Sequence, residues 1–159
     1  RDRPKDLHCV MHSHEINSQT LAASKSKLIP LTQEGCQLYE RVGYHEFNGI
    51  VLNDEEKEKL INAIGNEKHT LLMRNHGLIT SGPTAAWAFI RHQHFIRNAE
   101  VQLKLMASNA EMSIISDNIL KHTREQFEGG SAQAGAKVRH PEWPAFWRLL
   151  DSLDEKWKQ

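Results

Sequence analysis

The hydrophobic and polar residues of the chain follow two different periods, which predict a succession of strands and helices. Short apolar runs bounded by polar or turn-forming residues predict strands at residues 8–14, 43–47, 50–52, 70–73 and 78–80. Apolar residues that recur every three to four positions predict helices at residues 15–26, 54–64, 84–107 and 118–127. A last, strongly amphipathic helix is predicted from Pro141 to about Trp157. Strands that alternate with helices in this way are typical of an α/β domain.

Proline and glycine positions add detail between these elements. Ile29 precedes a proline, which favours an extended segment at residues 28–31, and a short helix or turn is predicted at residues 34–39. The two strands predicted after residue 70 are joined by the turn-forming sequence Asn75-His76-Gly77. Gly77 can adopt a positive φ at little cost, so the chain can reverse beside His76.

The domain organisation is inferred from composition. With 159 residues, of which 39% are hydrophobic, the chain is long enough for one globular core. Gly, Ala and Ser dominate residues 129–137, which predicts a flexible linker. We therefore expect a main domain at residues 1–128 and a C-terminal helical segment at residues 138–159 that docks on it. The polar start, without an initiator Met, leads us to expect a piece of a longer protein.

Charge and cysteine content exclude several classes of function. Twenty basic and twenty acidic residues cancel, so no overall field attracts nucleic acid or an anionic membrane surface. No apolar run approaches the ~20 residues of a membrane span. Cys9 and Cys36 form no CxxC motif, and we expect two reduced thiols in a cytoplasmic protein.

Three histidines form the candidate chemical site. His12 and His14 lie two apart on a predicted strand, so both imidazoles point to the same face. His76, in the turn after another strand, could supply a third ligand. Three protein ligands with an open position are typical of a catalytic metal, which must contact its substrate. The alternative is that a His-x-His pair on a strand is only two polar residues on a solvated face.

A second His-x-His sequence, His92-Gln93-His94, is not expected to bind metal. It lies on the long predicted helix, where residues two apart differ by about 200° around the axis. The two imidazoles should therefore diverge, and replacing His92 with Ala should leave the metal content unchanged.

Three stretches in a fixed order resemble the class II aldolase/adducin family. Residues 10–14, Val-Met-His-Ser-His, resemble that family's strand ending in His-x-His. Residues 71–79, Leu-Leu-Met-Arg-Asn-His-Gly-Leu-Ile, are similar to its signature around Arg-Asn-His-Gly. Gly82 and the long helix over residues 86–105 resemble the family's sequence immediately after that signature. Residues 44–51 are closer to adducin-like members than to the sugar-phosphate aldolases.

The resemblance implies a three-layer α/β/α fold with a central, mostly antiparallel sheet. It also implies that His12, His14 and His76 match the three metal-binding histidines. The metal would be divalent, zinc first, with manganese, iron and nickel as alternatives. Family members are often tetramers, so a homo-oligomer is expected.

The same resemblance leaves the catalytic residue unknown. The family's phosphate-binding loop and catalytic acid precede the His-x-His strand, so this chain should correspond to the C-terminal two thirds of the domain. Glu15, Glu46 and Tyr44 are present, but nothing in the sequence places them beside the three histidines.

Two hypotheses of function are compatible with the sequence. The first is a metal-dependent aldolase-type lyase, or a related epimerase or decarboxylase, for a small hydroxy-carbonyl or sugar-like substrate. The second is a non-catalytic, adducin-like domain that acts by self-association and protein contacts. The absence of a basic tail argues against a membrane-skeleton role, because anionic lipid would attract such a tail.

Overall fold

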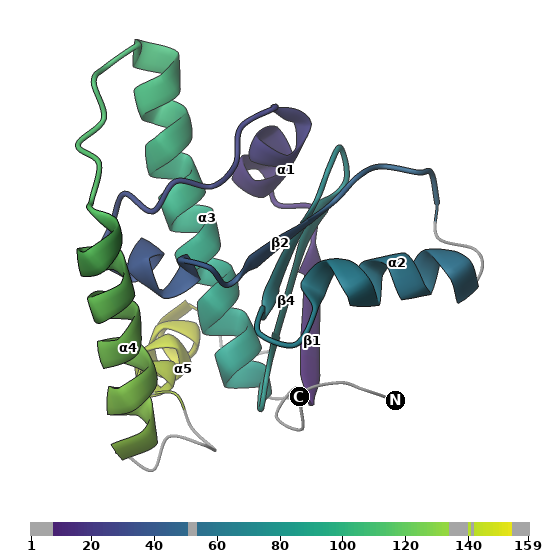
Figure 1. Cartoon of the computed structure of the whole chain (residues 1–159). Coiled ribbons are helices and arrows are strands. Elements are labelled where there is room, and N and C mark those ends of the chain that lie inside the picture. Colours follow the sequence, from purple (N-terminus) through teal and green to yellow (C-terminus); the bar gives the residue numbers. More distant parts are fainter. Residues whose placement is uncertain (1–7, 51–53, 134–139, 141, 154–159) are drawn as a thin grey trace.

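A computed structural model describes residues 8–50, 54–133, 140 and 142–153 of the chain (Figure 1). The strands are β1 (Cys9–Ser13), β2 (Val42–His45), β3 (Thr70–Met73) and β4 (Gly77–Gly82). The helices are α1 (Ile16–Ala23), the 3₁₀ helix η1 (Glu34–Leu38), α2 (Asp54–Ile64), α3 (Ala85–Ser108), α4 (Asp117–Gln133) and α5 (Trp143–Leu153).

The four strands form one mixed sheet in the order β1-β4-β3-β2. Strand β4 lies antiparallel to both β1 and β3, whereas β2 and β3 are parallel. Residue Ser13 pairs with Leu78 and His12 pairs with Ile79, so the end of β1 lies beside the start of β4. The expectation of a mostly antiparallel sheet is confirmed, because β2 supplies the one parallel pairing among the described strands.

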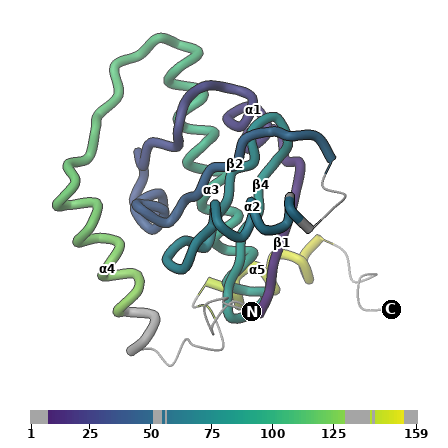
Figure 2. Tube along the Cα trace, turned by 45° about the vertical axis from the view of Figure 1, so that its right-hand side comes forward, coloured from purple at the N-terminus to yellow at the C-terminus, as the bar shows by residue number. Residues whose placement is uncertain are grey.

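Helices cover both faces of this sheet. Leu72 and Leu78 belong to a buried core with Leu21 of α1 and Phe95 of α3. Gly43 of β2 lies against the carbonyl of Ala63 in α2, on the opposite face. The sheet therefore lies between α1 with α3 on one side and α2 on the other, as Figures 1 and 2 show.

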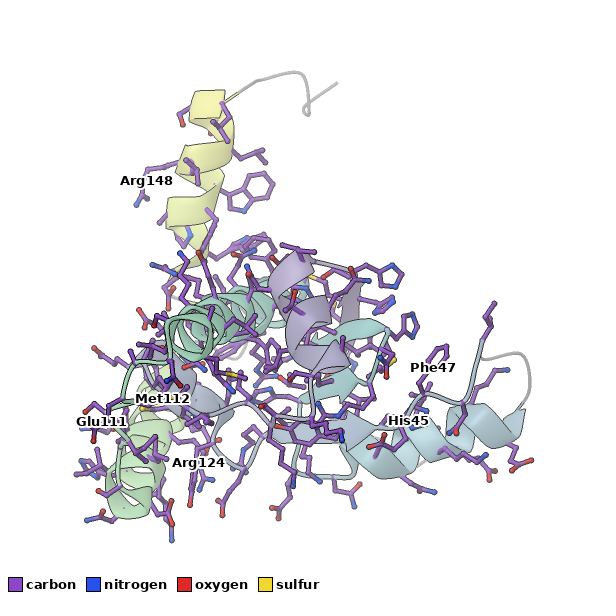
Figure 3. All side chains as sticks on the ribbon, turned by 90° about the horizontal axis from the view of Figure 1, so that it is seen from above. His45, Phe47, Glu111, Met112, Arg124 and Arg148 are labelled. Atoms are coloured by element: carbon purple, nitrogen blue, oxygen red, sulfur yellow. The ribbon has the colours of Figure 1, made fainter. Side chains whose placement is uncertain are left out.

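The C-terminal helices pack on α3 and η1 rather than on the sheet. Helix α4 lies beside η1, and α5 contacts α3 through Phe89, whose ring lies 5.6 Å from Trp143 and 5.1 Å from Phe146. Seen from above, the rest of α5 projects away from the domain (Figure 3). Leu153 at its end is 73% exposed. The ring contacts between α5 and α3 are therefore made by the first turns of α5.

Several sequence-based predictions need correction. The first helix ends at Ala23, three residues before the predicted end at residue 26. Ile50 lies in an exposed bend, not in a buried strand, and the rest of the strand predicted there lies outside the described residues. Helix α4 continues to Gln133, so the first part of the predicted linker is helical. The remainder of that linker, residues 134–137, lies outside the described part of the chain.

Two further features of the described residues concern the cysteines and the character of the helices. Neither Cys9 nor Cys36 takes part in a disulfide bond. Of the helices in the described ranges, none combines the length and the apolar character needed to cross a membrane.

Candidate metal centre

The structure brings His12, His14 and His76 together. Their ring centroids lie 4.7 Å apart for His12 and His14, 5.0 Å for His12 and His76, and 4.9 Å for His14 and His76. One nitrogen from each ring can be chosen so that all three lie within 4.8 Å of one another. Three imidazoles from two segments more than 60 residues apart therefore converge on one point.

The tautomer of His12 is set by the sheet. Its Nδ1 lies 3.0 Å from the carbonyl oxygen of Leu78, which can only accept, so Nδ1 carries the proton. The lone pair is then on Nε2, which lies 3.0 Å from Nε2 of His14. A ring nitrogen that donates to a backbone carbonyl while the other faces the ion is the usual arrangement of a metal-binding histidine.

The turn that carries His76 is held by α1. Asn75 adopts a positive φ of 55°, and its N–H donates to the carbonyl of Ala22 at 3.2 Å. The side-chain amide of Gln19 donates to the carbonyl of His76 at 3.0 Å. The reversal predicted at Gly77 therefore takes place at Asn75, a residue type that tolerates the left-handed region.

Gly77 has a steric role instead. A Cβ atom added to Gly77 would collide with the carbonyl oxygen of Ser13 and would lie 2.9 Å from Cδ2 of His14 and 3.4 Å from Cε1 of His12. Only glycine lets β4 approach the end of β1 this closely. The three rings can meet because this position has no side chain.

Arg74 fixes the same turn to the C-terminal end of α1. Its Nη1 donates to the carbonyls of Ser24 at 3.0 Å and Ser26 at 2.9 Å. The guanidinium also lies over the ring of Tyr44, 5.1 Å from its centroid. A cation at the end of a helix that lacks basic residues in its last turn is favourable for the helix dipole.

Comparison with known proteins decides the family. The profile of the Class II Aldolase and Adducin N-terminal domain matches residues 2–103. The chain belongs to the class II aldolase and adducin family.

Relatives come from both branches of this family. A provisionally named aldolase class 2 protein of Pseudomonas aeruginosa is 30% identical over 154 residues, which cover 97% of this chain and 59% of that protein. Alpha-adducin of Rattus norvegicus is 28% identical over 156 residues, which cover 93% of this chain and 21% of that protein. The chain thus spans little more than half of the bacterial relative and about a fifth of the adducin.

Solved structures support the class II aldolase fold. An aldolase II superfamily protein from Pseudomonas syringae has a TM-score of 0.74 at 27% identity, covering 92% of this chain and 56% of that one. An L-fuculose 1-phosphate aldolase from Glaciozyma antarctica has a TM-score of 0.64 at 21% identity, covering 74% of this chain and 43% of that one. At the second identity the likeness concerns the fold alone. The α/β fold implied by the sequence resemblance is confirmed.

The donor set of this class II aldolase-type chain fits a divalent ion. Burial, and then the nearby charges of His12 and His14, lower the pKa of His76, which favours the neutral ring that a metal requires. Neutral imidazoles suit zinc, iron and nickel, whereas manganese prefers oxygen ligands. In the part of the chain that the structure describes, the group with metal-binding spacing consists of these three histidines.

The acidic and phenolic side chains considered from the sequence have other roles here. The Glu15 carboxylate is the N-cap of α1, where it accepts from the N–H groups of Asn17 and Ser18, both at 3.0 Å. The hydroxyl of Tyr44 accepts from the N–H of Leu28 at 3.0 Å, and burial raises its pKa. Glu46 is exposed. None of the three is placed by the structure as a general base.

The two histidines of the helical His-x-His sequence diverge, as expected. His92 lies between Ser13, whose Oγ is 2.6 Å from Nε2, and Thr80, whose Oγ1 is 3.1 Å from Nδ1. His94 instead contacts Gln37 at 3.1 Å and Glu142 at 3.3 Å. Burial lowers the pKa of His92 to about 4, so this ring is neutral at pH 7.

Some of the residues that shape this centre are missing from the sequence-based prediction. Gln19 belongs to no motif, and Ser13 is only the variable middle residue of the His-x-His stretch; the roles of both depend on partners more than 50 residues away. Arg74 and Gly77 belong to the Arg-Asn-His-Gly stretch that carries the family resemblance, which is the one signal that points to them.

Proposed function

We propose that His12, His14 and His76 bind one divalent metal ion, zinc in the first instance, with manganese, iron or nickel as alternatives. We propose further that this centre serves an aldolase-type carbon–carbon lyase, or a related epimerase or decarboxylase, for a small hydroxy-carbonyl or sugar-like substrate. The observation that carries the proposal is the convergence of three imidazole nitrogens within 4.8 Å in a member of this family.

The residues of the chain can prepare such a centre in three ways. The Leu78 carbonyl holds the His12 ring so that Nε2 is available as a ligand. The absence of a side chain at Gly77 leaves room for the rings of His12 and His14. Three protein ligands leave coordination positions open for the oxygens of a substrate. When bound, a divalent ion supplies Lewis acidity that polarises a substrate carbonyl.

Proton transfer is not assigned to a residue of this chain. The Glu15 carboxylate already accepts two main-chain N–H groups, and removing it from them would cost α1 its N-cap. Because the chain spans only part of its relatives, the complete reaction is proposed for the whole protein. The homo-oligomer expected from the resemblance also remains a prediction, which sedimentation analysis would check.

The metal content of the purified chain tests the proposal. We expect close to one divalent ion per chain by elemental analysis after incubation with zinc. His76→Ala should remove most of that ion and leave the circular dichroism spectrum unchanged, because His76 lies in a turn at the surface of the core. His122→Ala, which removes an exposed histidine of α4, is the matched control and should retain the metal. Full retention of metal by His76→Ala would refute the three-histidine site.

The similarity to alpha-adducin favours a second candidate, a non-catalytic domain for protein contacts. In that case the family fold would be retained without a functional metal. Failure to bind zinc or manganese, measured by calorimetry on the folded chain, would make this candidate the better one. A bound metal would favour the enzymatic candidate, and the next experiment would screen hydroxy-carbonyl substrates.

A further inference from the structure

We propose that His92, a residue of α3 that does not face the three histidines, is a positioning residue for the candidate metal centre. It acts through Ser13, the residue between the ligands His12 and His14. This inference rests on the proposed metal site and adds to it a buried hydrogen-bond relay from helix to sheet.

The direction of each hydrogen bond in the relay is determined by its ends. The hydroxyl of Thr80 donates to the carbonyl of Ala88 at 2.8 Å, so its oxygen is left to accept from Nδ1–H of His92 at 3.1 Å. The other ring nitrogen, Nε2, then carries the lone pair. It accepts the hydroxyl proton of Ser13 at 2.6 Å, the shortest bond of the series.

Ser13 passes this constraint to both neighbouring histidines. Side chains alternate along β1, so Ser13 points toward α3 while His12 points to the opposite face. The Ser13 oxygen also lies 3.4 Å from the N–H of Glu15, so a short side-chain turn encloses His14. Because the β1–β4 ladder ends at the Ser13–Leu78 pair, the Ser13 side chain is what holds the β1 side of His14, while the Glu15 cap of α1 holds the other side.

The burial of the relay makes it an anchor of fixed geometry. His92 is 1% exposed and Thr80 is fully buried, so water cannot replace a broken bond without rearrangement. Loss of the relay should therefore let the end of β1 move, which changes the distance between the His12 and His14 nitrogens. Substitution of a residue that is hydrogen-bonded to a metal ligand commonly lowers metal affinity by about 10–100-fold. Since His92 acts through Ser13, we expect the lower end, about tenfold.

Zinc affinity and the ring signals of His14 in the metal-free chain test this proposal together. Ser13→Ala and His92→Leu should each weaken zinc binding about tenfold, measured by competition with a chromogenic chelator, without changing the stoichiometry at saturation. The double variant should be weakened by about the same factor rather than a hundredfold, because both changes break one bond. His92→Gln offers an amide oxygen to Ser13 and should remain within about twofold of the wild type.

His94→Leu is the matched control. It removes a ring that is 3% exposed on the same helix and is bonded to Gln37 and Glu142 instead of the sheet. It should reduce thermal stability, as His92→Leu does, and leave zinc affinity within about twofold of the wild type. Equal zinc affinity in His92→Leu and His94→Leu would overturn the positioning role and leave the metal site standing.

The metal-free measurement separates this proposal from the proposed function. The ring nitrogen–proton signals of His14, observed by NMR, should shift from their wild-type positions in Ser13→Ala and His92→Leu. In His92→Gln and in His94→Leu they should stay close to the wild-type positions. If the wild-type chain bound no zinc but showed these shifts, the metal site would fail and the positioning relay would stand. Unchanged His14 signals in Ser13→Ala and His92→Leu would overturn the relay whatever the zinc result.

Discussion

Gly77 lies against the ring of His14 at the point where β4 meets the end of β1. A Cβ at Gly77 would lie 2.9 Å from Cδ2 of the His14 ring and would collide with the backbone oxygen of Ser13. The backbone cannot move away easily, because Ser13 and Leu78 are paired in the sheet. A single hydrogen in place of a methyl group therefore decides whether the three imidazoles can converge.

Gly77→Ala should accordingly damage the metal site more than the fold. We expect a loss of about 1–3 kcal/mol in the free energy of unfolding, the usual cost of overpacking. We expect zinc affinity to fall at least tenfold, because the added methyl group displaces His14 and the end of β1. Zinc titration and urea unfolding of the same sample measure the two effects.

Gly129→Ala is the control for this prediction. Gly129 lies in α4, and nothing would meet a Cβ there within 4 Å. This change should stabilise the chain by about 0.5–1 kcal/mol, since alanine favours a helix over glycine. Zinc affinity should not change. Equal zinc affinity in Gly77→Ala and the wild type would show that the close approach does not matter.

Arg74 should contribute strongly to stability although it lies in a turn. Its Nη1 bonds the carbonyls of Ser24 and Ser26, and its guanidinium stacks on Tyr44. Hydrogen bonds that involve a charged group contribute about 1.5–3 kcal/mol, so Arg74→Met should cost about 2–4 kcal/mol. The midpoint of urea unfolding measures this cost.

A second variant at the same position and a control at a surface arginine accompany Arg74→Met. Arg74→Lys keeps the charge but not the planar group, and should recover less than half of the loss. Arg97→Met, at an exposed position of α3, should change the unfolding free energy by less than about 0.5 kcal/mol. An Arg74→Met chain as stable as Arg97→Met would contradict the anchoring role.

The elements of the fold can be predicted largely from the spacing of apolar residues. The predicted bounds of helix α3 agree with the structure within one residue at each end, because Pro83 precedes its start and its apolar face is continuous. Strand alternation places His12 and His14 on one face, and the turn signal places His76 at a strand end. Local patterns of this kind depend on neighbouring residues only, so one sequence is sufficient to read them.

The errors arise where a distant side chain decides the local structure. The first helix ends at Ala23 because Ser24 is extended and Arg74, fifty residues away, bonds the carbonyls beyond the helix. Composition predicts a linker from residue 129, but α4 continues through Gly129 to Gln133. The sequence allows a positive φ at Gly77, but the structure has that conformation at Asn75. The actual role of Gly77, close packing against the end of β1, depends on where β1 lies and cannot be read from the local sequence.

His140 makes the stability of the chain depend on pH. Its ring packs on Trp87 at 4.4 Å and is 5% exposed, and burial lowers its pKa from 6.5 to about 4. The unfolded chain therefore binds this proton more tightly than the folded chain does. Stability from this residue is complete above pH 6.5 and is lost as the pH falls toward 4. The loss is on the order of 3 kcal/mol.

His140→Phe isolates this contribution. Phenylalanine keeps a ring against Trp87 but does not titrate, so the variant should lose less stability between pH 6.5 and 4 than the wild type. Urea unfolding at several pH values in that range gives the free energy of unfolding of each protein as a function of pH. The slopes of the two curves should differ by the amount that corresponds to the uptake of about one proton on unfolding. Parallel curves would show that His140 titrates normally in the folded chain. The carboxylates affect both proteins alike and cancel in the comparison.

The side chain of Asn98 in α3 makes hydrogen bonds to the main chain of the extended segment at residues 28–31. These bonds take the place of those that a neighbouring strand would make. Its Oδ1 accepts from the N–H groups of Leu31 at 2.9 Å and Thr32 at 3.3 Å, and its Nδ2 donates to the carbonyl of Ile29 at 2.8 Å. One fully buried amide thus satisfies three main-chain groups that a strand neighbour would otherwise bond.

Asn98→Leu keeps the branched shape of the side chain, although leucine is larger, and removes all of these bonds. A main-chain group left without a partner costs up to about 1–3 kcal/mol, and these three are partly buried, so we expect a loss of about 3 kcal/mol in the free energy of unfolding and fast hydrogen exchange at Leu31. Lys104→Leu, at an exposed position of the same helix, should cost less than about 0.5 kcal/mol. Urea unfolding with hydrogen exchange detected by NMR measures both effects. Slow exchange at Leu31 in Asn98→Leu would mean that the segment is held by packing alone, and that the apolar pattern, rather than a buried amide, determines its path.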